Sequence, residues 1–372
     1  MKKTRSKMGE ADFVLFTVIM ILLSIGIIMV YSASAWTSGI QKGDDMYYLK
    51  RQLIWAILGI IAMIFTMGID YHKLKKITGL IMIITIPLLF AVFAFEPVNE
   101  ARRWIQLGFA SIQPSEIAKY AVVLLLAKSM DEKGERIQSL IYGVIPYLLV
   151  SGAVAAIILV EPNMSIASVI MMVTIIMIFV AGAKSFHIFG LIVPAAIAGA
   201  FLLIFSKDYR RDRFLNFLDP WKDAAGEGYQ LIQSLLALGS GGIWGLGLGQ
   251  SRQKCYYLPE PHNDFIFAII GEELGLIGTI FIIGLFMVLV WRGIRTAVNA
   301  KDTYGTLLAT GITSIIAVQA IVNIAVVTGS MPVTGVPLPF ISYGGSSLVV
   351  NLTAMGILLN ISRQTNNSKA KI

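Results

Sequence analysis

Apolar segments about as long as a membrane is thick recur along this chain and restrict how it can fold. A helix needs about 20 apolar residues to cross the roughly 30 Å hydrocarbon core of a bilayer. Charged residues make up 14% of the sequence, against about a quarter in soluble domains. We therefore predict an all-α, polytopic membrane protein that forms one domain over residues 1–372.

Ten segments are long and apolar enough to be candidate spans. The first follows a basic amino terminus (Lys2, Lys3, Arg5 and Lys7), but its apolar run is too long for a signal peptide, so we expect a retained helix. The fourth begins at Pro114, and only the surface turn Glu161–Pro162 separates the fifth from the sixth. The spans are 13–33, 52–69, 77–95, 114–130, 138–160, 163–182, 185–206, 264–291, 304–328 and 342–361.

The placement of lysine and arginine sets the predicted orientation. With the amino terminus inside, the cytoplasmic segments hold 17 of the 30 basic residues and 7 acids, whereas the outer segments hold 12 of each. Such an excess of positive charge in cytoplasmic loops is a topology signal. Both termini are expected in the cytoplasm, and the net charge of +8 requires no nucleic-acid partner.

One outer segment, residues 207–263 between the seventh and eighth spans, is much longer than most other connections. Structureless loops of this length are uncommon, so we expect short helices within it, including an amphipathic one over 229–238. The segment contains the only cysteine, Cys255, which excludes internal disulfides. The three histidines of the chain show no metal-ligand spacing.

Asp264 stands where this segment meets the eighth span. An acid at that depth is costly and therefore marks a candidate functional site. A half-dry pocket raises the pKa of a carboxyl group, which suits a general base, and Lys254, Glu260 and His262 precede it in the same loop. The alternative is that Asp264 caps the helix, a role that aspartate fills well.

A second polar group lies at the start of the fourth span. Glu116 and Lys119 are three residues apart and share a helix face, so they form either an ion pair that makes the span tolerable to lipid or a charged wall of an outer cavity. Upstream, Arg102 and Arg103 precede Trp104. Paired arginines suit diphosphate oxygens, although ordinary loop charges would look the same.

Two further features leave alternatives open. The glycine-rich run 239–249 lacks the strand and the Lys-Ser/Thr ending of a nucleotide loop; it either packs closely against helices or offers backbone amides to a phosphate. Glu272 and Glu273 lie about 12 Å along the eighth span, with no basic residue near them in sequence. Their role, structural or functional, is undecided at this point.

Several ordered motifs resemble the SEDS family (shape, elongation, division and sporulation proteins, which include FtsW, RodA and SpoVE). The likeness covers residues 12–363, and details at 31–34, 101–104 and 340–347 are closer to the FtsW and SpoVE subgroup. One departure is Asn163, where family members usually carry an aspartate. The motifs are Arg102–Ile105, Gln113–Lys119, Phe217–Pro220, Gln233–Ser234, Gly239–Gly249, Tyr257–Asp264 with its continuation to Gly275, and Pro337–Gly345.

The resemblance implies a peptidoglycan glycosyltransferase that polymerises lipid II at the outer face of the bacterial cytoplasmic membrane during division or sporulation. By the family's pattern, Asp264 is the essential acid, expected to act as the base in an inverting transfer. A divalent cation (Mg²⁺ or Mn²⁺) held by Asp264 or Glu260 is a candidate cofactor. The expected substrate-binding residues are Arg102, Arg103, Trp104, Glu116, Lys119, Arg213, Gln233, Ser234, Lys254, Glu260 and His262.

The resemblance also implies partners and a location. The expected partners are lipid II, the glycan carried on undecaprenyl diphosphate, a class B penicillin-binding protein acting as transpeptidase, and other divisome or sporulation membrane proteins at the septum. One rival function is a lipid II flippase or another transporter that uses Glu116, Lys119, Glu272 and Glu273 as its pathway. Another is a scaffold that only recruits septal partners. The concentration of acids at the outer end favours polymerisation over transport.

Overall fold

The computed structural model describes residues 9–97, 101–108, 111–206, 208–226, 228–255 and 257–369. The basic residues between positions 2 and 7 lie outside this part, as do the side chains of 208–210, 213 and 366–369. Within the described part, the chain is almost entirely helical, with one two-stranded sheet. The elements are α1 (Phe13–Lys42), α2 (Tyr47–Gly68), α3 (His72–Ala91), η1 (Val92–Ala94), β1 (Ile105–Gln106), β2 (Ser111–Ile112), α4 (Pro114–Lys133), η2 (Gly134–Gln138), η3 (Leu140–Val144), α5 (Ile145–Val160), α6 (Met164–Val180), η4 (Phe186–Ile192), α7 (Val193–Phe205), α8 (Asp208–Leu218), η5 (Pro220–Asp223), α9 (Tyr229–Gly241), α10 (Ile266–Val298), α11 (Thr303–Val327) and α12 (Gly345–Lys369).

All ten predicted spans are helices in the described chain. Eight helical segments are long and apolar enough to cross a membrane by length and composition. The other two predicted spans are α6, which is shorter at 17 residues, and α4, which carries Glu116 and Lys119 near its start and Lys133 in its last turn. The predicted ends are less accurate, since α1 continues to Lys42 and α10 to Val298.

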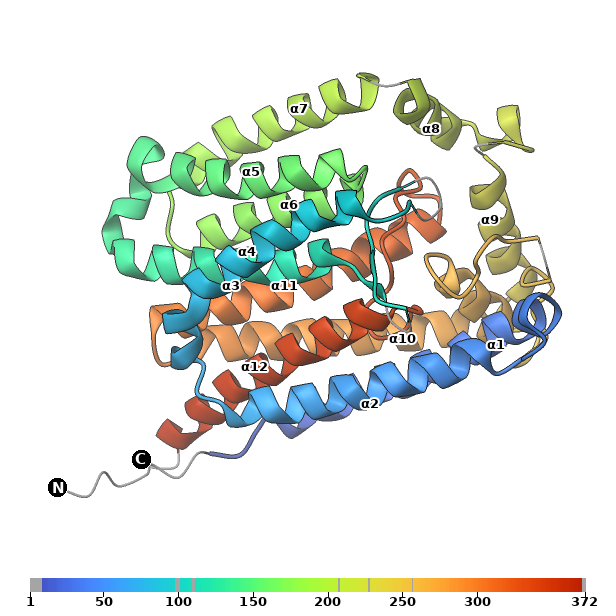
Figure 1. Ribbon diagram of the computed structural model, residues 1–372, viewed down its shortest axis with the longest axis horizontal. Coiled ribbons are helices and arrows are strands. Elements are labelled where there is room, and N and C mark those ends of the chain that lie inside the picture. Colours follow the sequence, from blue (N-terminus) through green and yellow to red (C-terminus); the bar gives the residue numbers. More distant parts are fainter. Residues whose placement is uncertain are drawn as a thin grey trace.

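The long helices run side by side, with α11 at the centre of the bundle (Figure 1). Helix α11 packs against α10, α4 and α6, and most of its residues are buried. Helix α12 pairs with α2, and α1 lies between α2 and α10. This central position of α11 matters because its far end reaches the candidate site.

The two ends of the described chain meet at one end of the bundle (Figure 1). The amide of Asp12 donates to Ser362 Oγ at 3.1 Å, and Arg363 Nε donates to the carbonyl of Gly9 at 3.1 Å. Arg292, at the same end of α10, donates to the Asp12 carboxylate at 2.7 Å. This is the end predicted to face the cytoplasm, and we call the opposite end the outer end.

The long outer segment has helices of its own, as predicted. It contains α8, η5 and α9, and α9 begins at Tyr229, where the amphipathic helix was expected. Helix α7, which precedes it, has no buried residue and packs mainly against its chain neighbours η4 and α8. Figure 1 shows α7 along the edge of the bundle, away from α10 and α11.

Helix α10 is broken at Gly275, whose φ of 65° and ψ of −165° are non-helical. The break is paired with the glycine-rich run, since Leu246 N donates to the carbonyl of Glu272 at 2.9 Å and Gly247 N to that of Glu273 at 3.0 Å. A Cβ at Gly245 would lie 2.2 Å from the Glu273 carbonyl oxygen. The run therefore packs closely against a helix, and these two amides are not available to a phosphate.

Candidate active site

Asp264 lies at the outer end, two residues before α10 begins. Its side chain is half-buried, and the described residues donate no hydrogen bond to its carboxylate. Its backbone carbonyl accepts a 2.7 Å hydrogen bond from Asn323 Nδ2 of α11, which fixes its position. The N-cap of α10 is Phe265, without a side-chain cap, so the alternative of Asp264 as a helix cap is wrong.

The surroundings of Asp264 make it a basic carboxylate. Burial and, to a smaller extent, the negative charge of Glu260 raise its pKa, the positive charge of Arg103 lowers it, and the net result is a pKa of about 6. The backbone at Gly335 lies close to this carboxylate, since a Cβ added there would be 3.2 Å from Asp264 Oδ2. A carboxyl group with this pKa is mostly ionised at pH 7 and is well suited to accept a proton.

Arg103 is the arginine that the fold brings to Asp264. It lies between η1 and the hairpin in which Ile105 pairs with Ile112. Its Nε donates to the carbonyl of Glu161 at 3.3 Å, and its Nη2 donates to the carbonyl of Pro162. Arg102 instead is exposed and donates to the carbonyl of Phe93 at 3.0 Å, so the two arginines do not act as one fork.

Glu116 and Lys119 form a completely buried ion pair on α4. Their charged atoms are 2.9 Å apart, and their side chains are 1% and 0% exposed. The pair faces other helices rather than lipid, because α4 packs against α3, α6 and α11. Next to it, Asn163 Nδ2 donates to Ser115 Oγ at 3.4 Å, so the start of α4 touches the turn that binds Arg103.

His262 and Glu260 flank the site in different ways. The His262 ring is buried between Tyr48 and Tyr343, with ring centroids 4.2 Å and 5.6 Å away. Burial lowers the pKa of His262 to about 4, so the ring is neutral at pH 7. Glu260 is exposed and accepts a 2.8 Å hydrogen bond from Asn263.

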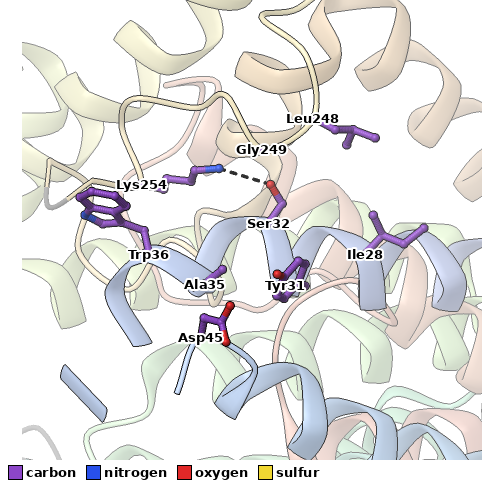
Figure 2. Close-up of a pocket in the computed structure, with 9 residues that line it drawn as sticks. All are labelled: Ile28, Tyr31, Ser32, Ala35, Trp36, Asp45, Leu248, Gly249 and Lys254. Carbon is purple, nitrogen blue, oxygen red and sulfur yellow. Dashed lines mark hydrogen bonds between the residues drawn. The ribbon is translucent and has the colours of Figure 1, made fainter. Parts of the chain in front are cut away.

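Lys254 belongs to a second cluster. Its Nζ lies 2.9 Å from Glu273 Oε1, and Ser32 Oγ of α1 donates to both oxygens of the same carboxylate. Figure 2 shows Lys254 and Ser32 on the wall of a cavity of about 540 Å³, together with Tyr31, Trp36 and Leu248. Lys254 is therefore neutralised by a buried acid at a separate cavity.

Glu272 and Glu273 together hold the outer loop in place. Glu272 accepts hydrogen bonds from Ser251 Oγ and from the amide of Arg252, the latter at 2.9 Å. Glu273 also accepts from the amide of Ser251 at 3.3 Å. These contacts give both acids a structural role, which the sequence had left undecided.

The remaining predicted residues are dispersed. Ser234 is buried and donates to the carbonyl of Val327 at 2.8 Å, which joins α9 to α11. Gln233 and Trp104 are half-buried. The side chain of Arg213 lies outside the described part. The site therefore gathers Asp264, Arg103 and Glu260, and the Asn163–Ser115 hydrogen bond links the turn at Arg103 to the helix that carries the Glu116–Lys119 pair.

Two residues of the site were not predicted from the sequence. Asn323 carried no signal, since a polar residue inside an apolar helix does not reveal its partner. Glu161 is fully buried beside Arg103. Its sequence signal is the same as that of Asp264, an acid at a membrane helix end, but with Pro162 beside it the pattern indicates only a surface turn.

These features define a multi-pass membrane protein with a half-buried carboxylate and an arginine at its outer end. The family of cell cycle proteins FtsW, RodA and SpoVE matches residues 12–367, and the chain belongs to that family.

Relatives of known identity cover nearly the whole chain. Stage V sporulation protein E of Bacillus subtilis is 47% identical, covering 96% of this chain and 98% of the relative. A probable peptidoglycan glycosyltransferase FtsW of Geobacter sp. (strain M18) is 42% identical, covering 94% and 96%. In both cases the similarity therefore extends over nearly the full length of both chains.

Solved structures share the fold. A chain from a peptidoglycan synthase complex, described for its coordination of polymerization and crosslinking, superposes with a TM-score of 0.78 at 27% identity, covering 95% of this chain and 98% of that one. The rod shape determining protein RodA of Thermus thermophilus superposes with a TM-score of 0.70 at 25% identity, covering 95% and 97%. The predicted family is thus confirmed by sequence and by fold.

Proposed function

We propose that this protein is a peptidoglycan glycosyltransferase that polymerises lipid II, with Asp264 as the base. The relatives named as peptidoglycan glycosyltransferases support the activity. The observation that carries the residue assignment is the half-buried Asp264 carboxylate, to which the described residues donate no hydrogen bond and whose pKa burial raises to about 6. Such a group is held ready for a proton that the protein itself does not supply.

The proposed reaction is one displacement with inversion. The acceptor's sugar hydroxyl attacks the anomeric carbon of the chain carried on undecaprenyl diphosphate, its proton passes to Asp264, and the bond from that carbon to the diphosphate breaks. Because an α-linked donor becomes a β-linked product in one step, no second, nucleophilic carboxylate is needed. Arg103 supplies positive charge near the base, where it can stabilise the leaving diphosphate.

The donor set for a metal ion is small. Asp264 and the nearby Glu260 are two carboxylates, and the described residues contain no group of three or more His, Cys, Asp or Glu that could hold a metal ion. Mg²⁺ takes octahedral oxygen coordination, often from one or two carboxylates together with substrate phosphates. The protein residues do not complete such a site by themselves, so a divalent cation enters the proposal only as a companion of the substrate diphosphate.

The test is polymerisation of lipid II by the purified protein with its partner. Asp264→Asn removes the base while keeping the shape of the side chain, and we expect glycan strands to fall by at least 100-fold, the usual contribution of a general base. Asp44→Asn makes the same chemical change on the exposed outer loop between α1 and α2 and serves as the control. Undiminished strands from Asp264→Asn would overturn the assignment.

Transport of lipid II remains the second candidate, and the contacts of the acids argue against it. Glu116, Glu272 and Glu273, which a transport pathway would use, are each engaged in buried internal contacts. Scrambling of labelled lipid II in liposomes, measured beside polymerisation, separates the two functions. Scrambling by Asp264→Asn without polymerisation would show that both activities exist.

The partners and location are also proposals. The solved relative in a peptidoglycan synthase complex supports pairing with a class B penicillin-binding protein as transpeptidase. The family's description as cell cycle proteins and the sporulation relative support a place at a division or sporulation septum. A fluorescent fusion that labels the whole membrane evenly throughout both division and sporulation would contradict the septal location.

A further inference from the structure

Glu161 is a buried acid that the mechanism above does not use. It follows α5 directly, its side chain is 0% exposed, and neither of its carboxylate oxygens has a hydrogen-bond partner in the described chain. An unpaired charged carboxylate is costly in such a place, so a buried acid of this kind is either neutral or has a function.

The turn that carries Glu161 touches three elements around Asp264. Arg103 donates to the carbonyls of Glu161 and Pro162. Asn163 donates to Ser115 at the start of α4. Ser165 Oγ donates to the carbonyl of Thr334, the neighbour of Gly335, whose close approach to Asp264 was described above. The turn is therefore connected to the base from two sides.

Among the described residues, few charged groups face Glu161. Arg103 is the charged group that acts on its carboxyl, and the same guanidinium acts on Asp264. From α4, the Glu116–Lys119 pair is internally compensated. The start of α6 and the segment around Thr334 contribute the uncharged groups Asn163, Ser165 and Thr334. Glu161 and Asp264 thus share one arginine.

We propose that Glu161 is a positioning residue that controls this shared arginine. In its neutral form it leaves the Arg103 charge to Asp264 and to the substrate diphosphate; in its ionised form it pairs with Arg103 and withdraws that charge from the site. The proposal rests on the proposed function, since it assigns Arg103 a task in the transfer.

The protonation of Glu161 agrees with this role. Burial raises the pKa of Glu161 to about 8, and Arg103 opposes the rise. The carboxyl is therefore neutral at pH 7 and mostly ionised at pH 9. Because the raised pKa favours the neutral form in the folded state, this group's contribution to stability is present below its ordinary pKa of 4.5 and is lost as the pH rises through about 8.

The experiment compares lipid II polymerisation at pH 7 and pH 9 by the full-length protein with its partner. The neutral fraction of a group with a pKa of about 8 falls about tenfold over this interval, so we expect the wild-type rate to fall by about tenfold. Glu161→Gln keeps the neutral form at both pH values and should reduce the fall to less than about twofold. Glu161→Asp should restore the fall, and Glu135→Gln, an exposed acid in η2, should leave it as in the wild type.

Two measurements keep the outcome decisive. Thermal unfolding at both pH values, with recovery of the rate on return to pH 7, shows whether alkali simply denatures the protein. Infrared difference spectra of the wild type should show a protonated carboxyl band that disappears between pH 7 and pH 9, whether or not the variants fold.

A tenfold fall that persists in folded Glu161→Gln, or the absence of the carboxyl band, would overturn this proposal. A wild-type protein that makes no glycan at any pH would instead overturn the proposed function. The two failures are therefore distinguishable.

Discussion

At the scale of single residues, two carboxyl groups at the outer end differ in protonation although burial acts on both. The pKa of Asp264 is raised to about 6 and that of Glu161 to about 8. At pH 7 the first is therefore mostly charged and the second mostly neutral. Burial is the main cause of both shifts and Arg103 opposes both, but the carboxyl of Asp264 starts from an ordinary pKa of 3.8 and that of Glu161 from 4.5. Environments that push two acids apart in this way separate a base from a neutral acid.

The charge of Glu260 should shift the midpoint of the pH dependence of polymerisation between pH 5 and pH 7. Because the base form of Asp264 increases about tenfold between pH 5 and pH 7, we expect polymerisation to rise by about tenfold over the same interval. Glu260→Gln removes a charge that raises this pKa, so the midpoint of the rise should move to lower pH. Rates of lipid II polymerisation between pH 5 and pH 7, measured for both proteins, test the shift.

A change in folding stability cannot account for the expected increase in activity between pH 5 and pH 7. The raised pKa of Asp264 favours the neutral acid in the folded state, so its contribution to stability is present below pH 3.8 and is lost as the pH rises through about 6. For this group, folding weakens over the interval in which activity is expected to increase. A midpoint that stays in place or moves upward in Glu260→Gln would contradict the assigned electrostatics.

At the scale of elements, the break in α10 is held by the glycine-rich run. Gly275 has a positive φ, and a Cβ there would lie 2.4 Å from Gly245 N, which is backbone and cannot yield. We expect Gly275→Ala to lower the free energy of unfolding by at least about 2 kcal/mol, because steric overlap adds to backbone strain. Thermal unfolding of the purified protein measures the loss.

The same helix offers a matched control. A Cβ at Gly284 would meet nothing within 4 Å, so Gly284→Ala should leave α10 unchanged or stabilise it by up to about 1 kcal/mol. Equal losses for the two substitutions would show that the break at Gly275 is not needed for folding.

The buried pair of Lys254 and Glu273 joins the outer loop to α10. Lys254→Met keeps much of the side-chain volume but leaves the Glu273 carboxylate without its cation, which costs about 3 kcal/mol for a buried pair. The double variant Lys254→Met/Glu273→Gln removes both charges and should recover part of that loss. Unfolding curves of the two variants test this explanation. If the double variant is no more stable than Lys254→Met, the loss of stability does not come from the unpaired Glu273 carboxylate.

At the scale of the whole molecule, the orientation of the bundle can be tested with two matched lysines. Lys222 in η5 has a side chain that is 78% exposed at the outer end, and Lys301 is exposed between α10 and α11. In a Cys255→Ser background, we expect a membrane-impermeant maleimide to label Lys222→Cys in intact cells and Lys301→Cys only after lysis. The reverse pattern would contradict the orientation predicted from charge.

Sequence alone predicted the helices well because a bilayer demands a fixed length of apolar residues. It also located Asp264, since an acid at a helix end is costly wherever the chain folds. It could not assign Lys254, whose partner Glu273 is 19 residues away in sequence and meets it only because the outer loop folds back onto the start of α10. Nor could it show that Arg103 rather than Arg102 faces Asp264, because the turn at Glu161 makes that choice.

Packing constrains the sequence of helix α7 much less than that of α11. Most of α11 is in contact with other helices, whereas α7 has no buried residue. A side chain that touches no fixed neighbour is constrained only by its preference for an apolar medium and by helix formation. In the single chain, α7 should therefore tolerate almost any exchange among apolar residues, and a saturation mutagenesis map should show it as the most permissive of the long helices.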